Sequence, residues 1–448
     1  MRTNLLETYS RQLKVAEAYV AKNFDGKTVS ANTQLTTAVL LDNTNRWMTE
    51  SMGMGLATTQ RSDLGDWKKF CLNLTNIAVP SLIANDLVIV HPMTSYSGSV
   101  AYLKYVALSD KNGMKDKVLN SVFAHGEMND ARMNYTSQIV VEEGATPALT
   151  VKEKGISYFE GKGVDVKYAD VKAIMADGSA QYVAKDAIPA EAKKIAYVSE
   201  EFQMMNVPAQ DIPTIGPKME RIALVAEPRR IAVRYDQITA FQAKTDYGFS
   251  LDKQIAEQAC GELAYEIDTE IVDMLYRAAF ANKGVEGQFV TFDKTQPIGV
   301  SKFEHYNAFL EVVEEAKAII YKRTRKFHPN YMVIGSNVLP VLRFVNGFTA
   351  VKTAKMNGPY KVGELDGLDV YVSPAIAENE FFFGLNGSDM MSSAGVYAPY
   401  MAIVPTQLLG TPDGGLTQGF STWYAKALLN DLLLVGGEIV DKVREDNI

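Results

Sequence analysis

Apolar residues repeat with a helical period over several long stretches of this chain. In the longest, from Ser250 to Gly284, one face collects apolar side chains and much of the rest is acidic. Ser250 is a suitable N-cap, and Asn282-Lys283-Gly284 is a suitable end. About 32 residues at roughly 1.5 Å each predict a rod of roughly 48 Å. The apolar positions are Ile255, Ala259, Leu263, Ile267, Ile271, Leu275 and Ala279.

The N-terminal segment has the same period. Asn4 and Glu7 have the spacing of a capping box, and a second helical stretch runs from about Leu35 to Trp47. We interpret residues 1–66 as an extended N-terminal arm; the alternative is a peripheral helical subdomain. The apolar face of the first helix is predicted to consist of Leu6, Tyr9, Leu13, Ala16, Val20 and Phe24.

A second well-bracketed helix follows the long one. Ser301 and Glu304 form a capping box, and Pro329 prevents continuation. A strand at Tyr331–Ile334 comes next, and then a short helix that ends near Val345. This alternation predicts a separate α/β domain over residues 300–405. Its first helix should bury Phe309, Val313, Ala316 and Ile320.

Other stretches favour strands. The continuous apolar run Leu87–Val90 predicts a strand covered on both faces, and Val100–Val106 continues the extended pattern. Arg230–Tyr235 alternates polar and apolar residues, as a half-buried strand does. The tail from Gln407 to Ile448 is again extended, notably at the apolar run Leu432–Val435, and we expect the tail to rejoin the sheet beside Leu87–Val90.

The region 110–219 differs in character, because its β-like pieces are short. Gln138–Val141 and Val164–Tyr168 are two of them. Ala173–Ala176 and Ala180–Val183 flank Asp177-Gly178, a pair suited to a tight hairpin turn. We interpret 110–219 as an extended loop that carries a β-rich insertion.

Composition bounds the class of protein. A chain of 448 residues, 47% of them hydrophobic, has room for two or three domains. The net charge of −8 argues against a protein whose main task is to grip nucleic acid, but not against a container for it. Two cysteines, Cys71 and Cys260, make no disulfide framework and fit a reducing compartment. The sequence shows neither a signal-peptide core nor an apolar run that could span a bilayer, so we expect a soluble cytoplasmic product.

Motifs for catalysis or cofactor binding are missing from the sequence. It contains no Walker A, HExxH, CxxC or GxSxG pattern, so we expect no catalytic residue, no cofactor and no metal. The basic run Lys322–Lys326 suits a helix C-terminus, where cations are favoured. A structural or assembly protein is therefore the favoured class. Structural roles are also the simplest interpretation of the four histidines, His91, His125, His305 and His328.

Two short segments carry a family resemblance. They are Ile83-Ala84-Asn85-Asp86-Leu87-Val88-Ile89-Val90-His91-Pro92-Met93-Thr94 and Ala394-Gly395-Val396-Tyr397-Ala398-Pro399-Tyr400-Met401-Ala402-Ile403-Val404-Pro405. They resemble the two halves of a signature in the major head proteins of T-even-type tailed bacteriophages, which have the Hong Kong 97 capsid fold. Arg230–Tyr235 with the long helix, Tyr331–Leu339 and Gly419–Ala425 resemble further pieces of the same proteins, in the same order. The signature residues are His91, Pro92, Met93, Thr94, Tyr397, Ala398, Pro399 and Tyr400.

The resemblance implies an α+β fold of Hong Kong 97 type with a long spine helix. Residues 67–109, 220–299 and 406–448 would form a peripheral domain, and 300–405 an axial domain. The subunit would be no enzyme. It would self-assemble as hexamers and pentamers into an icosahedral head that encloses double-stranded DNA.

The implied partners are copies of the chain, portal and scaffold proteins, decoration or vertex proteins, and packaged DNA through non-specific contact; no membrane is implied. The implied location is the virion, assembled in the host cytoplasm. Relatives are often trimmed near the N-terminus, but we expect the arm to be retained here, and we expect a separate scaffold protein.

Two alternatives stay open. One is an encapsulin-like nanocompartment shell protein with the same fold. The other is a hydrolase or sugar-binding enzyme whose site lies in the insertion, within Gln138–Met219.

Overall fold

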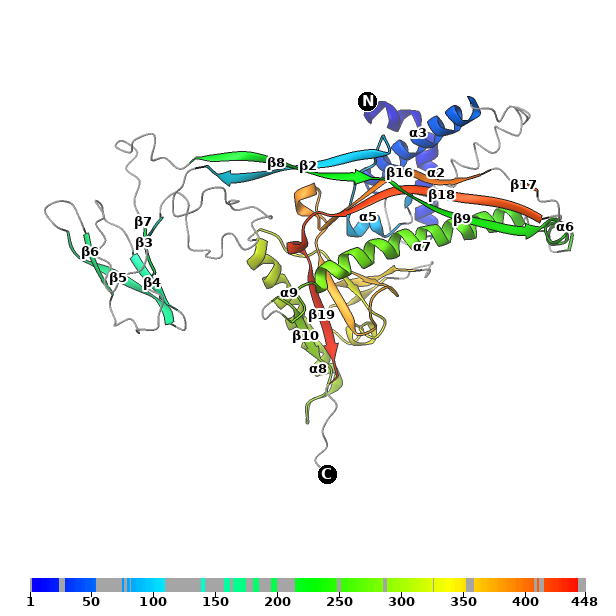
Figure 1. Ribbon diagram of the computed structural model, residues 1–448. Coiled ribbons are helices and arrows are strands. Elements are labelled where there is room, and N and C mark those ends of the chain that lie inside the picture. Colours follow the sequence, from blue (N-terminus) through cyan, green and yellow to red (C-terminus); the bar gives the residue numbers. More distant parts are fainter. Residues whose placement is uncertain are drawn as a thin grey trace. The chain divides into compact units, whose positions relative to one another are not determined.

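The computed structural model describes residues 2–23, 29–53, 75, 79–80, 82–108, 138–141, 157–161, 164–174, 180–184, 195–199, 214–246, 248, 251–284, 288–324, 326–351, 358–406, 409–410 and 415–441. The chain divides into two compact units, Met1–Tyr102 with Arg221–Ile448, and Leu103–Glu220. The boundary passes through β2 (Ser97–Ala107) and β8 (Ile215–Val225), two long strands that pair with each other (Figure 1). Helices and largely antiparallel sheets together make the fold α+β.

The first unit contains a five-stranded sheet. Its order is β1 (Ile89–Val90), β16 (Gly395–Pro405), β18 (Gly415–Leu428) and β17 (Leu409–Gly410), and β9 (Glu227–Asp236) pairs with the other edge of β18. The alternation predicted for Arg230–Tyr235 is confirmed, because within this segment the odd-numbered residues are half-buried and the even-numbered ones are exposed.

The predicted long helix is α7 (Leu251–Phe280), 30 residues in length. Six of its seven predicted apolar positions are buried, and Ile255 is half-buried. The chain leaves the helix before Gly284, whose φ of +87° suits glycine; Ser250 lies outside the described residues. Helix α6 (Gln237–Asp246) precedes α7. Along its length α7 packs on β9 and β18 and then on β15 and β19, so one rod supports both large sheets.

The second large sheet has seven strands, and its helices follow the predicted order. The capping box of Ser301 and Glu304 is present, but the predicted single helix is two helices that meet at Ala308. The strands in sheet order are β10 (Val290–Asp293), β19 (Val435–Val440), β15 (Glu380–Gly384), β11 (Tyr331–Ile334), β14 (Leu368–Val372), β13 (Tyr360–Leu365) and β12 (Thr349–Ala350). The helices beside it are α8 (Lys302–Asn307), α9 (Phe309–Thr324) and α10 (Leu339–Leu342).

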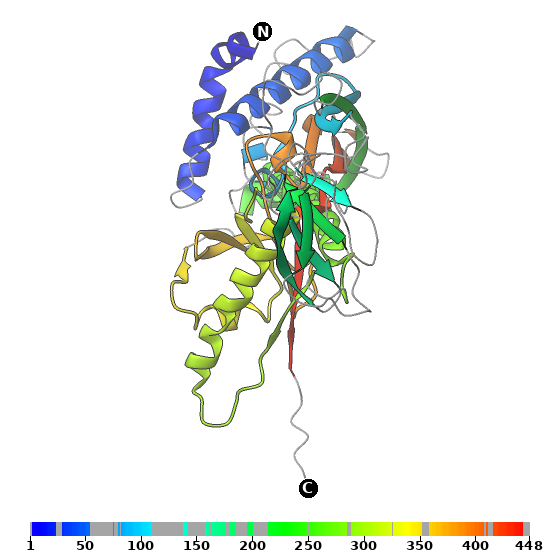
Figure 2. The same cartoon turned by 90° about the vertical axis from the view of Figure 1, so that its left-hand side faces the viewer.

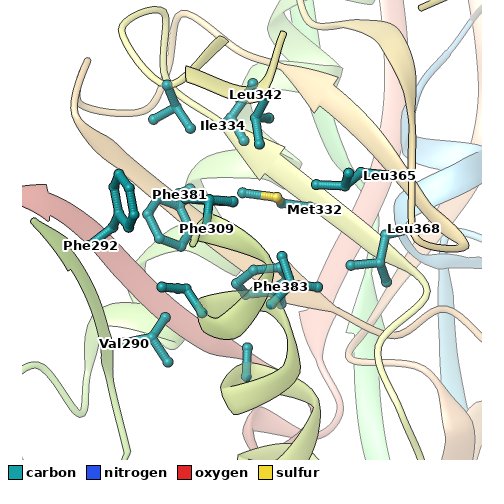
Figure 3. Close-up of a cluster of buried hydrophobic side chains, with 14 of the residues drawn as sticks. Val290, Phe292, Phe309, Met332, Ile334, Leu342, Leu365, Leu368, Phe381 and Phe383 are labelled. Atoms are coloured by element: carbon teal, nitrogen blue, oxygen red, sulfur yellow. The ribbon is translucent and has the colours of Figure 1, made fainter. Parts of the chain in front are cut away.

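The core of this sheet lies between its strands and α9. The rings of Phe309 in α9 and Phe381 meet edge to face with their centroids 5.4 Å apart, and the centroids of the Phe381 and Phe383 rings are 5.7 Å apart (Figure 3). All three rings are fully buried. The predicted stripe of α9 is confirmed, since Val313, Ala316 and Ile320 join the same cluster.

The expected position of the tail is wrong in part. Strand β18 does enter the sheet that contains β1, but β19 pairs with β10 and β15 of the other sheet, and Leu432-Leu433 lie in a 3-10 helix, Asp431–Leu433. Glycine permits the pairing with β15, because a Cβ at Gly437 would lie 2.3 Å from a ring carbon of Phe381. Only a strand without a side chain there fits against that ring.

The strand expected at Leu87–Val90 is shorter than predicted. Helix α5 (Ala84–Leu87) occupies the first part, and β1 keeps only Ile89 and Val90. Because β1 is the edge of the five-stranded sheet, the apolar run reflects a buried helix turn followed by a strand, not a central strand.

The N-terminal segment forms α1 (Arg2–Thr8), α2 (Ser10–Asn23) and α3 (Ala31–Gly53), shown in blue in Figure 2. Asn4 lies inside α1, so its predicted capping role is wrong. Tyr9, Leu13, Ala16 and Val20 are buried as predicted. The helices contact one another, and α3 packs on β16.

The second unit contains a five-stranded antiparallel sheet in the order β3-β7-β4-β5-β6. Strands β5 and β6 form the predicted hairpin, with Ile174 opposite Ala180; Asp177-Gly178 lies outside the described residues. The strands are β3 (Gln138–Val141), β4 (Ser157–Gly161), β5 (Val164–Ile174), β6 (Ala180–Ala184) and β7 (Ile195–Ser199).

Candidate assembly site: the signature junction

The two signature segments, about 300 positions apart in the sequence, meet in the first unit. Strand β1 pairs with β16 in parallel, with Val90 opposite Tyr397. The ladder continues beyond β1: the His91 N–H donates to the Tyr397 carbonyl at 2.9 Å, and the Met93 N–H donates to the Pro399 carbonyl at 2.9 Å. We call His91–Thr94 with Tyr397–Tyr400 the signature junction.

The junction faces the interior more than the solvent. Met93, Tyr397, Ala398 and Pro399 are buried, while His91, Pro92 and Tyr400 are half-buried. Thr94 alone among the eight is exposed. Burial raises the pKa of Tyr397, so its phenol stays neutral. A mostly buried, uncharged set of this kind suits a structural role.

Asn43 of α3 joins the two segments. Its Nδ2 donates to the Met93 carbonyl at 2.8 Å and to the Tyr400 carbonyl at 2.7 Å. The side chain is 6% exposed. The Tyr400 carbonyl lies where the pairing of β16 with β18 shifts register between Pro399 and Met401, and the Met93 carbonyl lies beyond the end of β1, so one amide supplies hydrogen bonds to both.

Asp268 of α7 holds the junction from another side. Its carboxylate accepts from the N–H groups of Ile83 at 3.2 Å and Ala84 at 2.9 Å, at the start of α5. An anion at a helix N-terminus satisfies donors that have no partner within the helix. Because α5 leads directly into β1, Asp268 fixes the entry of the chain into the junction.

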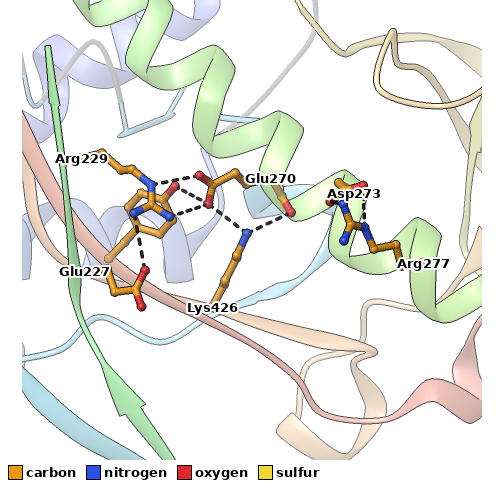
Figure 4. Close-up of polar contacts among 7 residues, drawn as sticks. Glu227, Arg229, Glu270, Asp273, Arg277 and Lys426 are labelled. Atoms are coloured by element: carbon orange, nitrogen blue, oxygen red, sulfur yellow. Dashed lines mark hydrogen bonds and ion pairs between the residues drawn. The ribbon is translucent and has the colours of Figure 1, made fainter.

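A charged cluster ties α7 to the five-stranded sheet (Figure 4). Glu270 accepts from Arg229 Nε at 2.9 Å and Arg229 Nη2 at 3.2 Å, from Lys426 Nζ at 2.9 Å, and from the Tyr424 hydroxyl at 2.9 Å. Arg229 comes from β9, and the other two come from β18. One carboxylate of the helix therefore fixes both strands.

The cluster changes the acidity of its members. Burial raises the pKa of Glu270, but hydrogen bonds from Arg229, Lys426 and Tyr424 outweigh it and lower the pKa from 4.5 to about 2. The hydrogen bond to Glu270 raises the pKa of Arg229. The pair therefore stays ionised across the ordinary pH range.

The described residues offer little for ligand chemistry. They contain no group of three or more His, Cys, Asp or Glu side chains that could hold a metal ion. His305 hydrogen-bonds the Asp293 carbonyl and His328 stacks on Tyr321, both within the fold. A cavity of about 10 Å³ between Leu40, Ile267 and Tyr397 is at the lower limit for one water. Among the helices that the structure describes, none is both long and apolar enough to cross a bilayer.

Sequence reasoning found the two halves of the junction but missed Asn43, Asp268 and Glu270. Spacing does not single these residues out. Asp268 lies three residues before Ile271 of the apolar face of α7, but Glu270 lies equally three residues after Ile267, and only Asp268 of the two is fully buried. The partners of Asn43 are distant in the sequence, so no local pattern indicates its role.

Comparisons with known proteins agree with the resemblance. The family model described as "Major capsid protein Gp23" matches residues 64–447. The chain is 24% identical over 401 residues to the major capsid protein of Escherichia phage AR1, covering 79% of this chain and 73% of that protein. It is 22% identical over 395 residues to that of Enterobacteria phage T4, with the same coverages.

A solved structure from Microbacterium phage Oxtober96 aligns at 12% identity with a TM-score of 0.40, covering 80% of this chain and 91% of that one. The family model alone matches most of the chain, and it includes both halves of the junction but not Asn43. The chain therefore belongs to the Major capsid protein Gp23 family, and it is a structural component of the phage head.

Proposed function

We propose that the chain is a shell subunit of Hong Kong 97 type that closes into an icosahedral head as hexamers and pentamers. The β2–β8 ribbon carries this proposal. A two-stranded sheet is marginally stable alone, and no third described strand pairs with this one. Apolar side chains toward its far end are nevertheless exposed, with Ile215 at 58%, Met219 at 56% and Leu108, directly after β2, at 52%. Contact with a neighbouring copy would cover them.

Domain roles follow from the elements. We assign the spine to α7, the peripheral domain to the five-stranded sheet, and the extended loop to β2, β8 and the second unit. The axial domain is assigned to the seven-stranded sheet, so it takes in β10 and β19 and leaves β16 to the peripheral domain. The signature junction then belongs to the peripheral domain, where it fixes the base of the extended loop, since Met93 packs with Val100 and Leu224.

Partners beyond the chain itself are part of the proposal. Head assembly calls for a scaffold protein and a portal, and the finished head offers a surface to decoration or vertex proteins. A net charge of −8 fits non-specific, weak contact with enclosed double-stranded DNA, because a strongly basic wall would hold the nucleic acid. No catalytic role is proposed.

The alternatives are less well supported. An encapsulin-like compartment shares the fold, but the family and the curated relatives are phage capsid proteins. An enzyme with its site in the insertion has no observation in its favour among the described residues.

Electron microscopy of the purified protein tests the proposal. We expect closed shells or capsomer rings when the chain is expressed with its scaffold protein, and aggregation or assembly when it is expressed alone. A stable monomer at high concentration that is inert toward scaffold would contradict it. Ile215→Ser with Leu108→Ser should lower the yield of shells, whereas Val15→Ser on α2, 50% exposed, serves as the matched surface control.

A further inference from the structure

Ile298 has the most exposed large apolar side chain among the described residues, at 92%. It lies in the loop between β10 and α8. The Val300 N–H donates to the Pro297 carbonyl at 3.4 Å, and Gly299 has φ +87°, the value that the third residue of a type II turn requires. Ile298 is therefore the second residue of a tight turn, at its apex.

The loop around this turn is fixed at both ends. The Lys294 N–H donates to the Val440 carbonyl at 2.8 Å, and the Thr295 N–H donates to Asp293 Oδ1 at 2.9 Å. On the other side the Ser301 and Glu304 capping box begins α8. A fixed loop presents Ile298 in one place, so little conformational entropy is lost when a partner covers it.

An aromatic surface lies on the same domain, formed by Phe303, Tyr306 and Phe344. Phe303 and Tyr306 are three residues apart on α8 and share a side of it. The Tyr306 and Phe344 rings have centroids 5.9 Å apart. Phe303 is 49% exposed and Phe344 51%. The domain thus carries both an apolar projection, Ile298, and an apolar aromatic surface of a kind that accepts such a side chain.

We propose that Ile298 of one copy packs on the aromatic surface of the next copy around a ring. This inference rests on the proposed function, because it takes the occupant to be a second copy in a hexamer or pentamer. Two different patches that complement each other make a head-to-tail interface, and such interfaces close into rings. Contact between two Ile298 loops is the alternative arrangement, and crosslinking distinguishes it from the head-to-tail contact.

Cysteine crosslinking of assembled shells tests the contact. The chain with both Ile298→Cys and Phe344→Cys, treated with a short bis-maleimide, should give a ladder on a denaturing gel that ends at six copies. All variants carry Cys71→Ser, so that the buried Cys260 is the only native thiol, and each single variant and the Cys71→Ser parent should remain monomeric. A ladder from Ile298→Cys alone would show that the loops meet one another and would overturn the proposal.

Loss of the contact gives a second measurement. Ile298→Asp should reduce ring formation at least about tenfold, as expected when a buried isoleucine is lost from an interface. Thermal unfolding of the subunit should not change, since the side chain is almost fully exposed. Val15→Asp is the control and should leave ring yield unaltered. Wild-type rings with neither crosslinks nor sensitivity to Ile298→Asp would overturn this contact alone; a wild-type chain that never forms rings would overturn the proposed function with it.

Discussion

The seven-stranded sheet is stabilised by a continuous apolar core, whereas the five-stranded sheet depends on single polar side chains that reach it from two helices. In the first, α9 and the strands share one cluster that includes Phe309, Phe381 and Phe383. In the second, the apolar clusters are smaller, and Asn43 and Glu270 connect the helices to the strands.

The difference has a physical meaning. Apolar burial is additive and tolerant of small shifts, because it depends on area. A hydrogen bond or ion pair depends on distance and angle, and leaving one partner buried alone is costly. In the five-stranded sheet, a few polar contacts therefore determine how the helices are positioned on the strands. In the seven-stranded sheet, many apolar contacts together supply the free energy of folding.

The largest effect should come from the apolar core. Phe309→Ala leaves a cavity between α9 and Phe381, and the free energy of unfolding should fall by about 3–5 kcal/mol. Chemical denaturation measures it. Phe241→Ala on α6, where the ring is 69% exposed, is the control and should have little effect. If both variants lost the same free energy of unfolding, the seven-stranded sheet would not depend on its apolar core in the way described.

An intermediate effect is expected at the signature junction. Asn43→Leu keeps a similar volume but leaves the Met93 and Tyr400 carbonyls without their donor, at a cost of about 1–3 kcal/mol. Thermal unfolding and hydrogen exchange at β16 measure it. Arg46→Ala on the same helix breaks an exposed ion pair with Asp42 and should cost less than about 1 kcal/mol. If Asn43→Leu were as mild as Arg46→Ala, the junction would not depend on this amide.

The smallest effect depends on pH. The pKa of Glu270 is lower in the folded chain than its ordinary 4.5, so its contribution to stability is present above that pH and is lost as the pH falls toward about 2. After allowance for partial exposure we expect about 1–2 kcal/mol. Denaturation between pH 5 and pH 2 should show this loss in the wild type and not in Glu270→Gln.

Arg277→Ala, which breaks an exposed pair with Asp273 one turn along α7, is the control for Glu270→Gln and should follow the wild-type pH profile. If the stability of the wild type and of Glu270→Gln changed with pH in the same way, the ionised Glu270 would make no contribution of its own to stability.

Local features were predictable and long-range pairing was not. The capping box at Ser301 and the buried face of α7 depend on residues a few positions apart, so the sequence displays them. The pairing of β19 does not depend on nearby residues. Alternation of polar and apolar residues shows that a strand is half-buried, but it does not show which sheet the strand joins. Asn43 reaches a carbonyl 357 positions away, and no local pattern encodes such a partner.

Short turn motifs also show how far a local pattern can predict structure. Asp366-Gly367 joins β13 to β14, with φ of 49° and 76°, as a two-residue hairpin turn requires. The same dipeptide at Asp177-Gly178 was the one singled out from the sequence. A short motif indicates a turn without ranking one occurrence above another.

The place of β19 has a consequence for synthesis on the ribosome. This strand lies between β10 and β15, although every other strand of its sheet is translated earlier. Until residues 435–440 emerge, β10 has no neighbour in the sheet and Phe381 lacks the glycine surface against which it packs. A chain cut short before that point would hold an open sheet edge instead of a finished domain, so incomplete translation products should be poor building blocks and seldom incorporated beside full-length ones.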